Sequence, residues 1–219
     1  MKPSANQLGV ETQNSVYGIA ESSGLLPHGS SMRVHLIGDS IRLNAQPFAR
    51  RFLAPAYCVA APLVNCESSH TVAANIGNWL EGTDPDIVHI NCGLHDIRHD
   101  PGCDRPVSSL GVYLANLRAI FGYLATTGAR IIWATSTPIN EGAHNRNKIS
   151  RRYESDLLRY NRLSADLARD AGFEVNDMFE KLSSTNFQAL LLPDGVHFTP
   201  SGNELIGKFI AESVQSVRP

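Results

Sequence analysis

The sequence predicts an α/β fold in which helices cover both faces of a five-stranded parallel sheet, a three-layer α/β/α sandwich. Two observations lead to this fold class. Five short runs rich in β-branched residues are spread along the chain, and segments with helical periodicity lie between them. Strands that alternate with helices are joined by right-handed crossovers, so they are expected to lie parallel in one sheet.

The five expected strands are short, and the first of them, MRVHLI, ends directly at Gly38. Their lengths are typical of buried strands in parallel sheets, which read as continuous apolar runs. The expected strands are Met32 to Ile37, Tyr57 to Ala61, Asp86 to Asn91, Arg130 to Ser136 and Phe173 to Asn176.

Helical periodicity is clearest in residues 107–126 and 150–171, and Gly128 and Gly172 follow them as C-terminal caps. Further helices are expected over residues 71–80 and 201–214. Trp79 and Trp133 lie within a helix and a strand pattern, which predicts that both belong to the core. In the 150–171 segment the expected core stripe is Tyr153, Leu157, Tyr160, Leu163 and Leu167. The expected solvated side is Arg152, Asp156, Arg159, Asp166 and Arg169.

Length and composition predict a single folded domain. The chain has 219 residues, of which 42% are hydrophobic, so it can bury a core and is not disordered as a whole. Residues 1–31 are rich in small and polar residues and are expected to form a flexible N-terminal arm, with the domain spanning residues 32–219. A net charge of −2 without a basic block argues against a nucleic-acid partner.

The apolar runs of the chain bear on its cellular location, and the spacing of its cysteines bears on metal and redox cofactors. No apolar run reaches the ~20 residues of a membrane span, and the start of the chain lacks the apolar middle of a secretory signal. These features predict a cytoplasmic protein without a membrane partner. Cys58, Cys66, Cys92 and Cys103 have neither zinc-ligand nor CxxC spacing, so free buried thiols are expected and no cofactor is predicted.

Residues whose side chains could take part in catalysis follow the expected strands. Ser40 comes after the first strand in Gly38-Asp39-Ser40, and Asp194 and His197 lie near the C-terminus in PDGVHF. Ligands of such sheets bind beyond the carboxyl ends of the strands. Acyl transfer by serine needs a hydroxyl, a base that takes its proton and an anchor for that base. The sequence therefore predicts Ser40 as nucleophile, His197 as base and Asp194 as its anchor.

From Met32 to the C-terminus, the chain resembles the SGNH/GDSL hydrolase family, whose fold is flavodoxin-like. The resemblance rests on the strand that ends in Gly38-Asp39-Ser40 and on the Asp-x-x-His block at residues 194–197, in this order at opposite ends of the domain. It implies a Ser40, Asp194 and His197 triad. It also implies that the backbone N–H of Ser40 is one donor of an oxyanion hole.

The two middle blocks of the family differ here. The second block carries a glycine whose backbone N–H is an oxyanion donor; Ser69 holds that place, and Ser68 is the competing register. The third block normally reads Gly-x-Asn-Asp, whereas this chain has Gly-Leu-His-Asp, so that His95 replaces the asparagine donor. An imidazole N–H also donates, so the resemblance implies an oxyanion hole of Ser40, Ser69 and His95. The Cys-Gly-Leu-His-Asp block at residues 92–96 resembles that of related family sequences, which implies a subgroup with histidine in place of the asparagine.

Other polar residues near the strand ends have competing interpretations. His95 and His99 have the spacing of a zinc pair, but no third ligand is evident and Asp100-Pro101 would end a helix, so no metal site is predicted. Asp39 and Arg42 are candidate substrate contacts, although a solvated Arg42 fits equally well. The polar segment 140–148 is expected to be a loop that borders the site and selects substrate.

The resulting hypothesis is a serine esterase that removes a short, acetyl-like acyl group from a small polar or carbohydrate-like ester. Polar post-strand loops and the lack of a long apolar lid favour this substrate class. An acyltransferase or thioesterase with the same triad is an alternative. A decayed hydrolase that acts as a binding module is another, while a nucleotide-binding module would need a glycine-rich loop that this chain lacks. The oligomeric state is left open.

Overall fold

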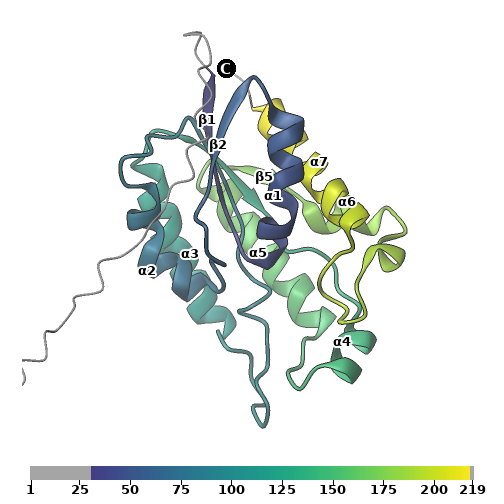
Figure 1. Cartoon of the computed structure of the whole chain (residues 1–219). Helices are drawn as coiled ribbons and strands as arrows, with labels where there is room; N and C mark the ends of the chain where they lie inside the picture. Colours follow the sequence, from purple (N-terminus) through teal and green to yellow (C-terminus); the bar gives the residue numbers. More distant parts are fainter. Residues whose placement is uncertain (1–30, 218–219) are drawn as a thin grey trace, which may run out of the picture.

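The computed structural model describes residues 31–217 and confirms the predicted fold class (Figure 1). Five parallel strands form one sheet in the order β2-β1-β3-β4-β5. The expectation of a flexible arm at the N-terminus falls almost wholly outside the described residues. The strands are β1 (Met32–Ile37), β2 (Tyr57–Ala60), β3 (Ile87–Ile90), β4 (Arg130–Ala134) and β5 (Glu174–Asn176).

Helices cover both faces of the sheet, which gives the expected three layers (Figure 1). On one face lie α1 (Ser40–Leu53), α6 (Met178–Ser183) and α7 (Pro200–Ser216). The opposite face is covered by α2 (Ser69–Leu80), α3 (Leu110–Ala125) and α5 (Glu154–Asp170). The short helix α4 (Glu141–Asn147) lies beyond the carboxyl edge of the sheet, and a 3-10 turn spans Phe187–Leu190.

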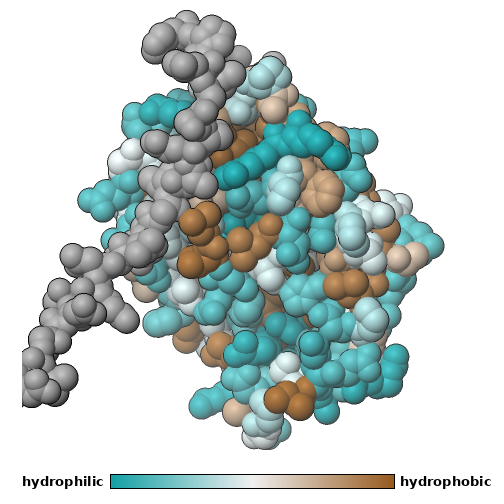
Figure 2. Space-filling model, in the orientation of Figure 1, coloured by the Kyte–Doolittle hydropathy of each residue, from teal (hydrophilic) through white to brown (hydrophobic). Residues whose placement is uncertain are grey.

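The core occupies both sides of the sheet, because the central strands are buried on both faces. Trp133 of β4 is fully buried, packs edge-on against Phe121 of α3 with ring centroids 5.2 Å apart, and donates from its indole N–H to Ser164. Trp79 is also buried. Both tryptophans therefore belong to the core, as predicted. On the face shown in Figure 2, hydrophobic side chains lie in small groups among hydrophilic ones, as is normal for a folded domain.

The core stripe of α5 differs from the one expected. Leu157 and Tyr160 are buried, but Leu163 and Leu167 lie at the margin and Tyr153 is exposed. Small or polar side chains complete the buried face instead, which lets the helix lie close to its neighbours: Asn161, Ser164, Ala165 and Ala168. Arg152, expected on the solvated side, is only 8% exposed. The physical reason is that α5 begins at Glu154, so Arg152 lies in the segment before the helix.

The expectation of free, buried cysteines is confirmed only in part. The four cysteines are free, but only Cys66 and Cys92 are buried, whereas Cys58 and Cys103 are exposed. Cys58 is exposed because β2 is an edge strand of the sheet.

Between residues 31 and 217, none of the helices has the length and apolar character that a membrane span requires.

Candidate active site

Ser40 lies where the first strand turns into the first helix. Asp39 caps α1, because its carboxylate accepts a hydrogen bond from the Ile41 N–H at 2.9 Å. Ser40 is therefore the first helical residue, and its own backbone N–H has no partner within the helix. This position places both the hydroxyl and the N–H of Ser40 at the carboxyl edge of the sheet.

A chain of hydrogen bonds joins Ser40 to His197 and Asp194. The Ser40 Oγ lies 2.9 Å from His197 Nε2, and His197 Nδ1 lies 2.6 Å from Asp194 Oδ2. A carboxylate only accepts, so Nδ1 carries the ring proton and donates it to Asp194. His197 Nε2 is then left as the acceptor of the Ser40 hydroxyl proton, which is the tautomer that a general base needs.

Asp194 is held as a carboxylate. Burial alone would raise its pKa, but the hydrogen bond from the His197 ring and those from the backbone N–H groups of Val196 and His197 outweigh it, and the pKa falls to about 2. Asp194 is therefore negatively charged throughout the neutral range. A fixed negative charge at this point would stabilise an imidazolium if His197 took up a proton.

The polar segment expected to be a loop forms α4, which supports the loop that carries Asp194 and His197. The N–H of Asn140 donates to the Gly195 carbonyl at 2.8 Å, and the Asn147 side chain donates to the Pro193 carbonyl at 2.6 Å. His144 Nδ1 lies 3.0 Å from the Asp194 carbonyl. The segment NEGAHNRNK lacks an apolar stripe because its polar side chains bond to a neighbouring backbone, and this is why periodicity missed the helix.

The predicted donor Ser69 is already occupied, so its assignment to the oxyanion hole is wrong. Its N–H donates to Asp96 Oδ2 at 2.8 Å, its hydroxyl donates to Asp96 Oδ1 at 2.5 Å, and the residue is fully buried. Ser68, the alternative register, is the N-cap of α2. No acceptor among residues 31–217 is bonded to the Ser68 N–H, and the nearby Cys66 N–H donates to the Gly38 carbonyl, which holds this loop beside the first strand.

His95 lies on the turn after β3 and is half-buried. Burial lowers the pKa of its imidazole, although the Asp39 carboxylate opposes this, and Arg152 and Arg98 lower the pKa further. The ring is therefore neutral near pH 7 and carries one N–H donor. Within the described part of the chain no hydrogen bond holds the ring, so that N–H is available to a ligand.

The possible metal pair does not form. His99 lies away from a helix in a bridge to Arg151, and its Nε2 contacts Asp156 Oδ2 at 3.0 Å. Over residues 31–217, no three side chains of the histidine, cysteine and carboxylate types are grouped as a metal site would need.

Asp39 and Arg42 are not placed to contact substrate. Asp39 is 1% exposed, and burial raises its pKa. Arg42 is 4% exposed, and its guanidinium donates to the carbonyls of Gly38 and Val64 at 3.0 and 2.7 Å. Arg42 therefore braces the loop after β2, and the expectation of either a substrate contact or a solvated side chain is wrong. Local sequence does not reveal such carbonyl partners.

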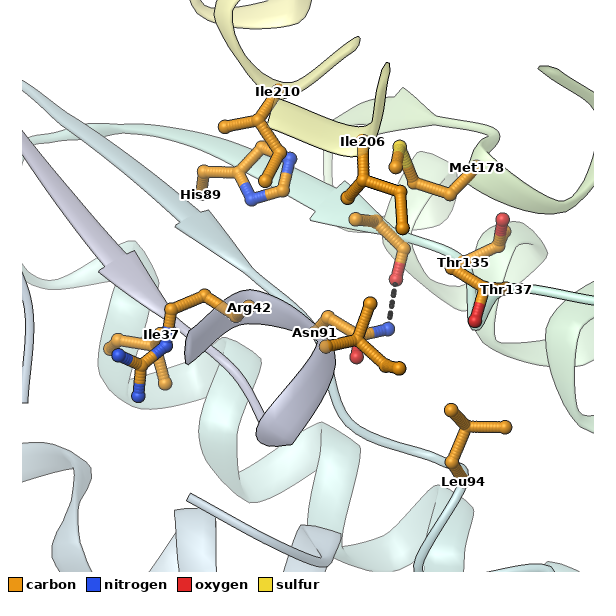
Figure 3. Close-up of a pocket in the computed structure, with 12 residues that line it drawn as sticks. Ile37, Arg42, His89, Asn91, Leu94, Thr135, Thr137, Met178, Ile206 and Ile210 are labelled. Atoms are coloured by element: carbon orange, nitrogen blue, oxygen red, sulfur yellow. Dashed lines mark hydrogen bonds between the residues drawn. The ribbon is translucent and has the colours of Figure 1, made fainter. Parts of the chain in front are cut away.

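A small, partly open cavity lies between the sheet and helices α1 and α7 (Figure 3). Its volume is about 30 Å³, and Ile37, Leu94 and Ile206 are among the residues that line it. Asn91 borders the cavity and donates to the Ala134 carbonyl at 2.9 Å (Figure 3). Neither Ser40 nor His197 lines the cavity, so the candidate active site is at the sheet edge and not in this space.

Sequence comparison connects this site to known hydrolases. Residues 36–205 match the model of the GDSL-like lipase/acylhydrolase family, a span that includes Ser40, His95, Asp194 and His197. The chain is also 29% identical over 102 residues to the human isoamyl acetate-hydrolyzing esterase 1 homolog. That alignment covers 43% of this chain and 41% of the length of the relative.

Solved structures share the fold. A lipase/acylhydrolase from Enterococcus faecalis superposes with a TM-score of 0.70 at 18% identity, covering 84% of this chain and 96% of that one. An acetyl xylan esterase gives a TM-score of 0.67 at 16% identity and covers 84% of this chain and 100% of that chain. An acetylxylan esterase from Geobacillus stearothermophilus gives 0.65 at 16% identity, covering 85% and 95%. At these identities the similarity concerns the fold.

Proposed function

The chain belongs to the GDSL-like lipase/acylhydrolase family, and we propose that it is a serine esterase that removes a short acyl group through an acyl-enzyme on Ser40. The observation that carries this proposal is the hydrogen-bonded chain from Ser40 Oγ to His197 Nε2, 2.9 Å, and from His197 Nδ1 to Asp194, 2.6 Å. In this order of hydrogen bonds, His197 Nε2 faces the Ser40 hydroxyl and can accept its proton, as nucleophilic attack by serine requires.

In the proposed mechanism His197 takes the hydroxyl proton while Ser40 Oγ attacks the ester carbonyl. The tetrahedral intermediate collapses as His197 returns the proton to the leaving alcohol, which leaves the acyl group on Ser40. Water then attacks the acyl-enzyme with His197 again as base, and the carboxylic acid is released. Asp194, with its pKa of about 2, remains charged in both halves of the reaction.

Three donors are proposed for the oxyanion: the backbone N–H groups of Ser40 and Ser68, and the ring of His95. Ser40 is the first residue of α1, so the positive end of the helix dipole also points at the developing charge. Among residues 31–217 no acceptor is bonded to the Ser68 N–H, whereas the Ser69 N–H donates to Asp96. His95 is neutral because burial lowers the pKa of its ring, and a neutral imidazole retains one N–H.

The substrate class is inferred from the acyl groups in the names of similar proteins. The relative is named as a homolog of an isoamyl acetate-hydrolyzing esterase and two of the structural neighbours are named as acetyl xylan esterases, so that all three names refer to acetyl esters. We infer an acetyl-like acyl group on a small polar or carbohydrate-like alcohol. An acyltransferase or thioesterase would use the same acyl-enzyme, with a different acceptor or leaving group in place of water or alcohol.

The test is release of p-nitrophenol from the acetate, butyrate and octanoate esters by the purified protein and by Ser40→Ala. We expect turnover of the acetate, a lower rate on each longer ester, and a loss of about 10³-fold or more in kcat in Ser40→Ala. Ser201→Ala removes an exposed hydroxyl from the first turn of α7 and should leave the rates unchanged. If the parent and Ser40→Ala do not differ on any ester, the esterase proposal fails and a binding role becomes the better account.

The same assay tests His95. Loss of one oxyanion donor costs about 10²–10³ in turnover in a comparable site, so His95→Ala should lose activity on that scale. His95→Asn supplies the amide donor found in most of the family and should retain activity within about tenfold of the parent. Equal rates for the parent and His95→Ala would remove His95 from the oxyanion hole.

A further inference from the structure

Arg152 is a buried cation without a direct carboxylate partner among the described residues. The residue is 8% exposed, and its side chain makes no salt bridge within 4.0 Å in residues 31–217. Burial lowers its pKa to about 10, which still leaves it charged at neutral pH. Burying a charge destabilises the folded state unless well-placed hydrogen bonds compensate for the lost hydration. The hydrogen-bond partners of this guanidinium therefore explain how it can be buried here.

The partners of Arg152 belong to two loops of the candidate active site. Its Nε donates to the carbonyl of Leu94 at 2.8 Å, and its Nη1 lies 3.0 Å from His144 Nε2. Leu94 directly precedes His95, the proposed oxyanion donor. His144 in turn contacts the backbone carbonyl of Asp194, which anchors the proposed base.

The chemistry of the partners determines the protonation state of His144. A guanidinium only donates, so His144 Nε2 is the acceptor and the ring proton is on Nδ1. From Nδ1 the ring donates to the Asp194 carbonyl at 3.0 Å. Burial lowers the pKa of His144, the hydrogen bond to Asp194 opposes this, and Arg152 lowers the pKa further, which keeps the ring neutral.

The backbone around Arg152 is also held in place. The N–H of Arg152 donates to Asn145 Oδ1 at 3.0 Å, and the amide of Asn145 donates to the Arg152 carbonyl at 3.1 Å. This pair of bonds joins the segment before α5 to helix α4. The guanidinium therefore projects from a fixed base, which a structural bridge between two loops needs.

We propose that Arg152 and His144 form a positioning relay that holds the loop of Asp194 and His197 against the loop of His95, so that base and oxyanion donor keep one geometry around Ser40. The relay runs from the Leu94 carbonyl through Arg152 and His144 to the Asp194 carbonyl. Neither residue touches the substrate. The proposal rests on the proposed esterase function, because it assigns the relay to that reaction.

The kinetic test uses Arg152→Gln, His144→Leu and the double variant. A displacement of catalytic groups by about 1 Å can cost about 10²-fold, so each single variant should lower kcat by about 10- to 100-fold, with KM changed less than about threefold. Because both residues act in one relay, the double variant should be no slower than the slower single variant. His144→Gln, which keeps one donor and one acceptor, should recover most of the activity.

Arg151→Gln is the matched control, since Arg151 is adjacent but exposed and donates to the carbonyls of Lys148 and Ser150. It should behave like the parent. Folding of each variant is checked by its thermal unfolding midpoint. If Arg152→Gln does not fold, the activities of His144→Leu and His144→Gln test the relay without it. A kcat within twofold of the parent in folded Arg152→Gln or His144→Leu, or rate losses that multiply in the double variant, would overturn the relay.

A measurement on the free protein separates this proposal from the esterase function. Histidine ¹⁵N NMR should show His144 as the Nδ1–H tautomer in the parent, and the pKa of His95 should rise in Arg152→Gln because Arg152 lowers it. An Nε2–H tautomer for His144 would contradict the proposed relay even if the enzyme is active. A protein inactive on every ester, with both NMR results as expected, would instead contradict the esterase proposal and leave the relay as a structural brace.

Discussion

At the scale of single residues, Asp194 uses both carboxylate oxygens. Oδ2 accepts from the His197 ring, while Oδ1 accepts from the backbone N–H groups of Val196 and His197. The side chain is 19% exposed, so these bonds are only partly screened by solvent. One residue therefore orients the proposed base and shapes the turn that presents it.

This arrangement predicts a pH-dependent contribution of Asp194 to stability. The pKa of Asp194 is about 2 in the folded protein, below the ordinary value of 3.8. A carboxyl group with a depressed pKa stabilises the fold above its unfolded pKa, and this contribution is lost as the pH falls through the folded value. The parent should therefore be more stable than Asp194→Asn at pH 7, with a difference that narrows between about pH 4 and pH 2.

Urea denaturation of both proteins from pH 7 down to about pH 2 measures this difference. Asp166→Asn, which removes an exposed carboxylate paired with Arg169, controls for the general effect of losing a negative charge. A stability difference between the parent and Asp194→Asn that widens as the pH falls would contradict the prediction.

At the scale of elements, α4 and the loop before α7 act as one unit. The two pack closely at Gly195, which has a φ of +72°. A Cβ at this position would lie 2.5 Å from the Asn140 carbonyl oxygen and 2.7 Å from the His144 nitrogen, both backbone atoms. Glycine is therefore needed for its conformation and for the contact with α4.

Gly195→Ala should destabilise the protein and also lower its activity, because the loop of Asp194 and His197 must move away from α4. Gly172→Ala is the matched control: its φ is +77°, but nothing lies within 4 Å of the added Cβ. The left-handed conformation alone costs an alanine about 1–2 kcal/mol, so Gly172→Ala should lose about this much stability with unchanged kcat/KM.

Denaturation and esterase kinetics on the two variants check this comparison. We expect Gly195→Ala to be the less stable of the two and to lose about tenfold or more in kcat/KM. Identical losses of stability in the two variants, with activity unchanged in both, would show that α4 does not support the loop in the way proposed.

At the scale of the whole molecule, the first and last helices pack directly on each other. Gly207 of α7 lies against α1 so closely that a Cβ there would be 2.6 Å from Phe48 Cβ and 2.8 Å from the Ala49 nitrogen. Since α1 carries Ser40 and α7 follows His197, this contact joins the two ends of the described domain around one core.

Gly207→Ala should therefore destabilise the domain by about 1–3 kcal/mol, the usual cost of overpacking. Gly122→Ala in α3 adds a methyl group into open space and should stabilise it by about 0.5–1 kcal/mol, because alanine is the better helix former. Thermal unfolding followed by tryptophan fluorescence and by circular dichroism should give one transition, lowered in Gly207→Ala and raised in Gly122→Ala. A stabilised Gly207→Ala would contradict the close packing.

Sequence patterns alone predicted the fold class, the five strands and the residues of the proposed triad. These features are local. Apolar periodicity marks each strand, and the parallel order brings the carboxyl ends of the strands to one edge. Ser40 follows the first strand directly, and Asp194 and His197 are three residues apart, so a short motif was enough to identify them.

The hydrogen-bond partners of the polar side chains around the triad depend instead on contacts between distant segments of the chain. Ser69 is blocked as a donor by Asp96, 27 residues away, and Arg152 bonds to Leu94, 58 residues away. Hydrogen-bond partners so far apart leave no periodic signal in the sequence. A buried polar group must nevertheless find a partner wherever the fold supplies one. The fold therefore determined which N–H groups remain free for a ligand and which side chains brace the loops.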